Sequence, residues 1–173
     1  MEKYEEIFKL AKKEIEVSDH LLYKTFSLIK DTKFLVAITE HVIKAASYAL
    51  GTILEYEKYW KRIGPYPPNL GIQIKIYSDK IARKYKLDPK YVRLLNNLME
   101  IKRYIKESPI RFKRQDKYIL STKDYETKSL DLDKVKRYFN LVKTFINDIE
   151  KVINENEQNS GSQKKAELRG LFA

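Results

Sequence analysis

The sequence contains no cysteine, only two histidines and only five glycines among its 173 residues. Without cysteine it can form no disulfide, no thiolate zinc site and no cysteine nucleophile. So few glycines leave no Gly-rich loop of the kind that cradles nucleotide phosphates. The longest apolar run covers residues 34–38, far below the ~20 residues that span a bilayer. The N-terminus is acidic and unlike a secretory signal, so we expect a cytoplasmic protein that does not contact a membrane.

The two histidines each follow an acidic residue: His20 follows Asp19, and His41 follows Glu40. Such a pair suits a general base, but neither histidine has a nucleophile or a metal-ligand spacing beside it. We therefore expect His20 on the surface and His41 half-buried with a hydrogen-bonded ring. The carboxylates show no spacing that singles out a pair. The sequence thus predicts no catalytic residues, no metal site and no cofactor, and a protein that is not an enzyme.

Positive charge is concentrated in the middle of the chain. Residues 58–128 carry 19 basic and 7 acidic side chains, whereas residues 1–57 carry 8 and 10 and residues 129–173 carry 8 and 7. The middle stretch also holds 6 of the 8 arginines and 8 of the 13 tyrosines. Segregated cations mixed with planar groups are typical of a surface that binds a polyanion. The alternative is a merely solvated face, since a composition rich in Lys, Glu, Ile and Tyr is also thermophile-like.

Apolar residues recur mostly at helical spacing, which predicts a mainly all-α protein. We expect a helical bundle of about five helices, over residues 2–30 with a break near 17–19, 34–60, 70–86, 88–108 and 131–153. The second helix has the clearest core stripe, formed by Phe34, Ile38, Val42, Ala45, Ala49, Ile53, Tyr56 and Trp60. In the third, alternation of Ile72, Ile74 and Ile76 also fits a strand, so that alternative stays open.

The remaining segments are distinguished by alternation and polarity. Alternating side chains over residues 110–128, with a turn at 114–116, predict a small antiparallel β-hairpin or a three-strand meander. Residues 1–153 then form a single helical bundle domain with this hairpin inserted. We expect the polar residues 154–165 to be a flexible linker and residues 166–173 to be a short apolar peptide.

Basic side chains cluster most densely around the predicted hairpin. The candidate nucleic-acid contacts there are Lys102, Arg103, Lys106, Arg111, Lys113, Arg114 and Lys117. Two further clusters contribute Lys61, Arg62, Arg83 and Lys84. Contacts of this kind recognise the charge and shape of a phosphate backbone rather than its sequence. Tyr104, Phe112 and Tyr118 are candidates for stacking on unpaired bases, although we expect Phe112 to be part of the core.

The order of elements resembles that of HEPN-type domains, among them small archaeal members. The resemblance rests on a helical bundle, the segment Ile105-Lys106-Glu107-Ser108-Pro109-Ile110-Arg111-Phe112, a strand pair and a closing helix. It covers residues 1–153 and implies a homodimer. HEPN ribonucleases carry an arginine followed a few residues later by a histidine. Arg103 stands in a suitable place, but residues 104–109 contain no histidine, which argues against RNA cleavage and leaves RNA binding open.

The end of the chain resembles the C-terminal tip of the archaeal ribosomal stalk protein, a short helix on a flexible tether that docks into grooves of translation factors. The matching segment is Ala166-Glu167-Leu168-Arg169-Gly170-Leu171-Phe172-Ala173. Leu168, Leu171 and Phe172 share one face of a helical turn that is too short to fold alone. We expect these residues to bind a groove of a protein partner. The alternative is a terminus without structure.

These features predict a non-catalytic protein that binds RNA or a ribonucleoprotein, such as the ribosome, and recruits a protein partner through its C-terminal peptide. One alternative is a HEPN-like ribonuclease or toxin–antitoxin component, in which folding brings Arg103 to His41 or His20. Another is a protein-only adaptor whose basic face binds an acidic partner.

Overall fold

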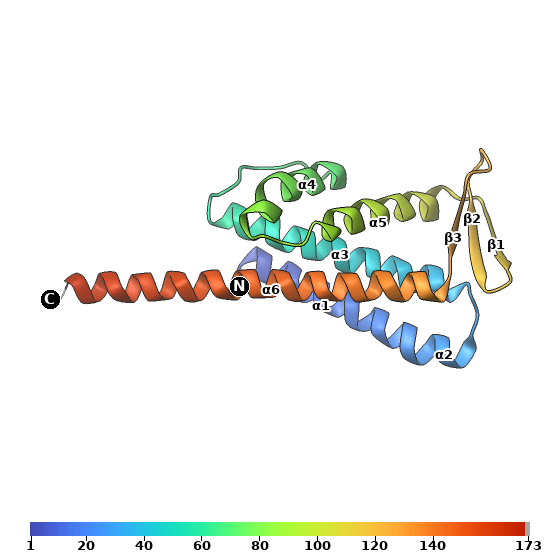
Figure 1. The fold of residues 1–173 in the computed structure, drawn as a ribbon, viewed down its shortest axis with the longest axis horizontal. Coiled ribbons are helices and arrows are strands. Elements are labelled where there is room, and N and C mark those ends of the chain that lie inside the picture. The colour runs from blue at the N-terminus through green and yellow to red at the C-terminus, as the bar shows by residue number, and fades with distance from the viewer. Residues whose placement is uncertain (172–173) are drawn as a thin grey trace.

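The computed structural model describes residues 1–171, without the side chains of residues 163–165 and 168. Figure 1 shows a helical bundle with a small sheet at one end and one long helix running along its length and beyond it. The predicted class, mainly α-helical with a small antiparallel β element, is confirmed. Within the described part of the chain, no helix is both long and apolar enough to cross a bilayer.

The first helix is continuous but contains a π-helical turn. It comprises α1 (Lys3–His20), the π-helical segment η1 (Leu21–Thr25) and α2 (Phe26–Ile29), and ends at Lys30 with a φ of 54°. The predicted break near 17–19 is therefore misplaced. Ser18 is buried within α1, and its hydroxyl donates to the Glu14 carbonyl at 2.9 Å. A π turn inserts one residue into the helical repeat, so it shifts the phase of the apolar pattern without ending the helix.

Helix α3 (Phe34–Tyr59) lies at the centre of the bundle. Most of the predicted stripe is fully buried, and Ile38, Val42 and Ile53 are inaccessible to solvent; each such side chain stabilises the fold by about 1.5–3 kcal/mol. Phe34, at the start of the stripe, is only partly buried, and Trp60 is 39% exposed because the helix ends one residue earlier.

The third and fourth helical segments begin at side-chain caps. Helix α4 (Leu70–Ile76) continues into the π-helical segment η2 (Tyr77–Ala82), so the strand alternative for residues 70–86 is wrong. The Asn69 side chain accepts from the Ile72 amide at 2.9 Å. Before α5 (Lys90–Glu107), the Asp88 carboxylate accepts from the Lys90 amide at 2.9 Å. These caps satisfy amides that have no partner inside the helix.

The predicted meander is confirmed as a three-stranded antiparallel sheet. Strands β1 (Ile110–Arg114), β2 (Lys117–Ser121) and β3 (Thr127–Leu130) lie in the order β1-β2-β3. The turn between β1 and β2 falls where the sequence predicts it, with Gln115 at a φ of 57°. Leu120 and Leu130 are fully buried, so this face of the sheet packs on the helices and leaves β1 as an exposed edge.

Helix α6 (Leu132–Leu171) corrects the prediction of a linker and a separate peptide. It begins as expected, with the Asp131 carboxylate accepting from the Lys134 amide at 2.8 Å. It then continues through residues 154–165, and Figure 1 shows its C-terminal part extending past the bundle, away from the sheet. A glycine costs only about 1 kcal/mol in a helix and the segment has no proline, so nothing local ends the helix once it has formed.

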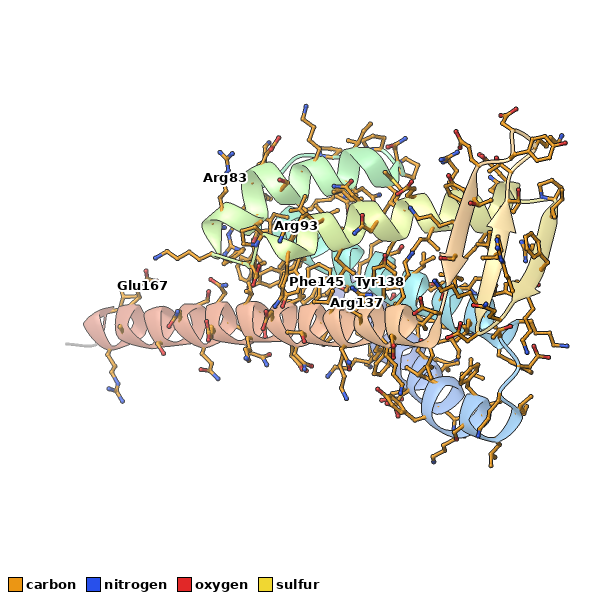
Figure 2. The ribbon with its side chains drawn as sticks, turned by 45° about the vertical axis from the view of Figure 1, so that its right-hand side comes forward. Arg83, Arg93, Arg137, Tyr138, Phe145 and Glu167 are labelled. Atoms are coloured by element: carbon orange, nitrogen blue, oxygen red, sulfur yellow. The ribbon has the colours of Figure 1, made fainter. Side chains whose placement is uncertain are left out.

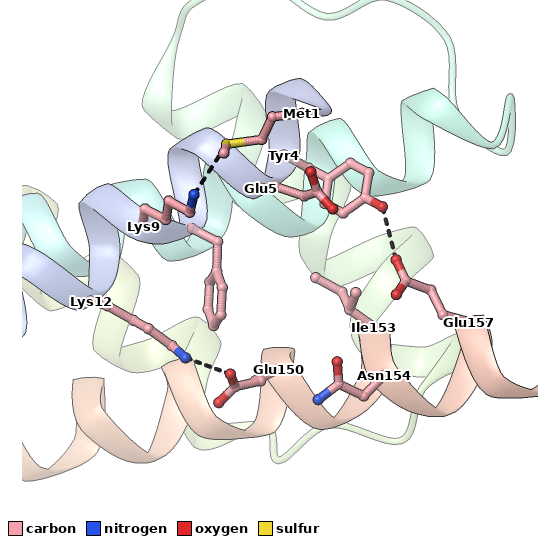
Figure 3. A pocket seen from close by; sticks show the side chains of 10 residues that line it. Met1, Tyr4, Glu5, Lys9, Lys12, Glu150, Ile153, Asn154 and Glu157 are labelled. Atoms are coloured by element: carbon pink, nitrogen blue, oxygen red, sulfur yellow. Dashed lines mark hydrogen bonds and ion pairs between the residues drawn. The ribbon is translucent and has the colours of Figure 1, made fainter.

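Two polar contacts hold α6 against α1, as Figure 3 shows. The Tyr4 hydroxyl donates to the Glu157 carboxylate at 2.8 Å, and Lys12 donates to Glu150 at 2.5 Å. Between the two contacts lies a hollow of about 470 Å³. The last buried residues of α6 are Val152 and Ile153, so Glu157 is close to the point where the helix leaves the bundle.

Candidate nucleic-acid interface

The fold separates the candidate basic residues into two groups at opposite ends of the molecule. Residues 102–117 lie at the sheet end, on the last turns of α5 and on the first hairpin, whereas Lys61, Arg62, Arg83 and Lys84 lie at the far end (Figure 1). Figure 2 shows Arg83 projecting from the bundle away from the sheet. The single connected surface that the charge segregation suggested is therefore two surfaces.

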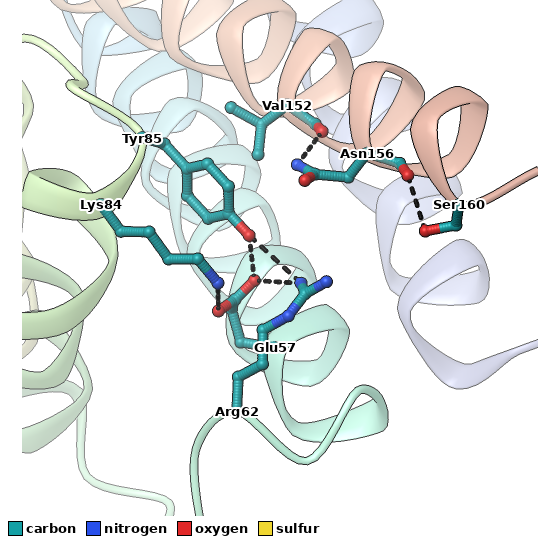
Figure 4. Close-up of polar contacts among 7 residues, drawn as sticks. All are labelled: Glu57, Arg62, Lys84, Tyr85, Val152, Asn156 and Ser160. Carbon is teal, nitrogen blue, oxygen red and sulfur yellow. Dashed lines mark hydrogen bonds and ion pairs between the residues drawn. The ribbon is translucent and has the colours of Figure 1, made fainter. Parts of the chain in front are cut away.

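The far group is partly neutralised by one buried carboxylate. Glu57 is 2% exposed and binds Arg62 and Lys84, each at 2.9 Å, while the Tyr85 hydroxyl also donates to it (Figure 4). Arg62 and Lys84 thus stabilise the fold by pairing with a buried carboxylate. Lys61 and Arg83 are exposed and form no ion pair with any described residue.

At the sheet end, helices α3 and α5 and strand β1 enclose a groove of about 600 Å³, which we call the basic groove. Its lining residues are Glu40, Ile43, Lys44, Ser47, Tyr48, Lys102, Ile105, Lys106 and Arg111. Four are cations and one is a carboxylate, so the lining has a formal charge of +3. None of the four cations forms an ion pair with a described residue. The groove therefore presents uncompensated positive charge to solvent.

Helical periodicity builds the two long walls of the basic groove. Residues 40, 44 and 48 follow one another at i, i+4 spacing on α3, and Lys102 and Lys106 do so on α5. Ile43 and Ile105 are 5% and 7% exposed and form its apolar floor. Arg111 closes the end, and its guanidinium donates to the Ile105 carbonyl. That contact places a cation at the C-terminus of α5, where the helix dipole favours it.

The cations of the hairpin lie on both faces of the sheet. Arg111 is paired with Leu120, whereas Arg114 is paired with Lys117 on the opposite, solvent-facing side. Lys113, Arg114 and Lys117 are all exposed and have no ion pair with a described residue. These residues extend the positive surface from the groove to the turn of the hairpin.

Phe112 corrects the expectation that it belongs to the core. It is 43% exposed on the outer face of the sheet, next to Ile110 at 47%. Tyr125, in the loop between β2 and β3, is 83% exposed. Of the other stacking candidates, Tyr104 is buried and Tyr118 is half-buried. The outer face of the sheet therefore combines the accessible ring of Phe112 with the cations Arg114 and Lys117.

Charges crowd at the junction of the sheet and α6. Burial, together with the nearby charges of Lys128 and Arg137, lowers the pKa of Lys134. Lys128 donates to Glu100 at 2.9 Å, and this bond lowers the pKa of that carboxyl. Burial is the main cause of the first shift, and the bond to Lys128 is the main cause of the second.

Arg103 is exposed at the edge of this region but is already engaged. Its guanidinium lies 4.9 Å from the centre of the Tyr104 ring and 3.4 Å from the Glu107 carboxylate. Such surface pairs are weak, but they distinguish Arg103 from Lys102 and Lys106, which form no ion pair with a described residue.

The histidines lie where the sequence predicts. His20 is exposed at the end of α1, and His41 is partly buried with its Nδ1 atom 2.6 Å from the Glu14 carboxylate. His41 thus faces α1, whereas Arg103 binds within α5. Among the described residues, no three His, Cys, Asp or Glu side chains are grouped as a metal site requires.

Two of the three predicted partner-binding residues, Leu168 and Leu171, belong to the protruding part of α6. Leu171 is 78% exposed and Leu168 lies one helical turn before it. Phe172 lies outside the described residues.

Sequence reasoning missed the contribution of α3 to the groove. Lys44 lies in the most apolar helix of the chain, far in sequence from the cationic segment. One signal was present, since Lys44 is the only basic residue between Phe34 and Tyr56. A lone cation in a core helix marks a position where that helix reaches the surface.

The chain matches no protein-family model, and no curated protein or solved structure shows significant similarity to it.

Proposed function

We propose that this protein binds RNA, either free or within a ribonucleoprotein such as the ribosome, through the sheet end of the bundle. The observation that carries the proposal is the basic groove, where Lys44, Lys102, Lys106 and Arg111 face a single carboxylate. Cations without intramolecular partners release counterions from a phosphate backbone on binding, and this release dominates affinity for nucleic acids.

The exposed rings of Phe112 and Tyr125 favour a single-stranded target. Phe112 lies on the outer face of the sheet with Arg114 and Lys117, and Tyr125 lies in the loop at the other end of β2. Bases that are not paired stack on accessible aromatic rings, each stack contributing about 1–3 kcal/mol. Paired bases in an A-form helix have no free face to offer. The arrangement of rings and cations therefore suits an unpaired segment better than a duplex.

The test compares two double charge reversals of equal composition. Lys106→Glu with Arg111→Glu changes the basic groove, and Lys61→Glu with Arg83→Glu changes two exposed cations at the far end. With a labelled single-stranded RNA, we expect the groove variant to bind about tenfold or more weakly. The slope of the logarithm of its binding constant against the logarithm of salt concentration should become less steep by about 1.4, at ~0.7 for each lost phosphate contact. The far-end variant should stay within about twofold of the wild type.

Two outcomes would reject the proposal: no salt-dependent binding by the wild type, or equal weakening in both variants. Equal weakening would mean that net charge acts without a site. A third variant, Phe112→Ala, separates stacking from charge, because it should weaken single-stranded RNA binding without changing the salt slope.

A further inference from the structure

A second hollow opens between α2, the hairpin turn and the start of α6, with a volume of about 850 Å³. We call it the α2–α6 pocket. Its residues are Leu22, Tyr23, Phe26, Ser27, Lys30, Thr32, Lys113, Gln115, Asp116, Leu132, Asp133 and Lys136. Apolar and aromatic side chains from α2 and its flanks form one wall, and charged side chains from the hairpin and α6 form the other. The pocket is therefore amphipathic.

Thr32 is the unusual residue of this pocket. It is 5% exposed, and its Oγ1 atom has no hydrogen-bond partner among the described residues. Other buried threonines of the protein are satisfied: the Thr39 hydroxyl donates to the Leu35 carbonyl at 2.6 Å, and that of Thr52 to the Tyr48 carbonyl at 2.8 Å. Leaving a buried hydroxyl unpaired destabilises a fold. A hydroxyl that lines a pocket gains a partner when a polar ligand enters.

The charged side chains of the other wall also lack partners within the protein. Lys30, Lys113 and Lys136 form no ion pair with any described residue, and the same is true of Asp116 and Asp133. Lysines of this kind bind phosphate as point charges. The aspartates and the Gln115 amide supply acceptors and donors of the kind that ribose hydroxyls and base edges require.

The aromatic wall suits a planar group. Tyr23 is 46% exposed, its ring packs edge-on against Phe139, and the Lys136 ammonium lies 5.7 Å from its centre. Phe26, at 9% exposure, lines the same wall from below. A base can stack on the exposed part of the Tyr23 ring while its phosphate reaches the lysines.

We propose that the α2–α6 pocket binds one nucleoside phosphate, with the base against Tyr23 and the phosphate among Lys30, Lys113 and Lys136. Thr32 donates its hydroxyl hydrogen to the bound group. The ligand is either a free nucleotide or the terminal nucleotide of a strand, and both present the same chemistry. For a free nucleotide the inference is independent of the proposed function, because none of the residues of the basic groove lines this pocket.

The experiment is calorimetric titration of the full chain with AMP, adenosine and inorganic phosphate. A second arm uses a short single-stranded RNA with either a 5′-phosphate or a 5′-hydroxyl. We expect AMP to bind more tightly than adenosine or phosphate, and Thr32→Val and Lys136→Met each to weaken AMP binding about fivefold. A preference for the 5′-phosphorylated RNA that both variants abolish identifies the strand terminus as the source.

Two matched variants serve as controls. Thr52→Val removes a buried hydroxyl elsewhere, and Lys143→Met removes an α6 lysine that lies over Phe139 as Lys136 lies over Tyr23. Both should bind AMP like the wild type. In the ligand-free protein, Thr52→Val should lower the melting temperature, and Thr32→Val should not.

The proposal is overturned if neither AMP nor the 5′-phosphate contributes to binding, or if Thr32→Val and Lys136→Met bind as tightly as their controls. Failure of this pocket would leave the salt-dependent affinity of the basic groove intact, and the two results are therefore distinguishable.

Discussion

Glu57 is the only buried carboxylate among the described residues, and three side chains converge on it (Figure 4). Arg62 and Lys84 supply charge, and the Tyr85 hydroxyl donates to the same group. The contact ties the end of α3 to the segment that follows η2. A buried carboxylate is tolerated only when it is paired in this way.

At this scale we predict the effect of neutralising that carboxylate. Glu57→Gln keeps the shape of the side chain but removes its charge, so Arg62 and Lys84 lose their partner. The free energy of unfolding should fall by about 1.5–3 kcal/mol, as expected for hydrogen bonds to a charged group. Because both cations reach solvent, the loss stays below that of a fully buried pair. Urea denaturation measures it.

Glu100→Gln is the matched control. Glu100 is 44% exposed and binds Lys128 at 2.9 Å, and exposed pairs contribute no more than about 1 kcal/mol. Equal losses in the two variants would contradict the structural role assigned to Glu57.

At the scale of elements, α6 has a packed N-terminal part and an exposed C-terminal part. Up to Ile153 it has a buried face, whereas from residue 161 to 171 every described side chain is exposed. A helical segment whose side chains are exposed on all sides gains nothing from packing. Its continuity comes from propagation out of the packed part.

We therefore predict that deleting residues 159–173 leaves the fold intact. The free energy of unfolding should change by less than about 0.5 kcal/mol, as for other surface changes, while helical circular dichroism falls. In the full chain, Glu157→Ala removes the Tyr4 contact and should cost about 1 kcal/mol. A large loss of stability on truncation, or a change in molecular mass by light scattering, would show that the protruding helix packs against a second copy.

Across the whole molecule, tyrosine hydroxyls repeatedly bind carboxylates. Tyr66 donates to Glu55 at 2.5 Å and Tyr91 to Asp148 at 2.5 Å, beside the Tyr4 and Tyr85 contacts. Burial first, and the bound carboxylate second, raise the pKa of each of these four phenols. Burial likewise raises the pKa of Tyr77, with the charge of Asp148 adding to it.

This pattern predicts loss of stability at alkaline pH. A pKa that is higher in the folded than in the unfolded state contributes stability that is complete below the unfolded value, about 10 for tyrosine. That contribution is lost as the pH rises above 10, at up to about 1.4 kcal/mol per pH unit for each strongly shifted tyrosine. Urea midpoints between pH 8 and 11.5 should fall steeply. Tyr91→Phe should flatten the decline, whereas Tyr125→Phe, at an exposed site, should not.

Most of the helices and the sheet could be predicted from the sequence because their signals are local. The Asp88 and Asp131 caps, the stripe of α3 and the alternation around Phe112 each depend on neighbours within a few residues. The misplaced break in the first helix and the missed continuation of α6 have the same origin. Neither a π turn nor a helix that extends without packing has a distinctive local amino-acid composition. The sequence around each therefore gives no signal for it.

The candidate site could be predicted only in part. Sequence identified the cations of α5 and the hairpin, but not Lys44, which joins them only because α3 crosses α5 at that point. Nor did it separate Arg62 and Lys84 from the remaining cations, since their partner Glu57 is buried by the packing of α3. The sequence alone determined the helical class, the caps and the concentration of charge, because these are properties of adjacent residues. Only the tertiary structure decided which charges share a groove and which are neutralised, because that depends on how helices distant in the chain cross.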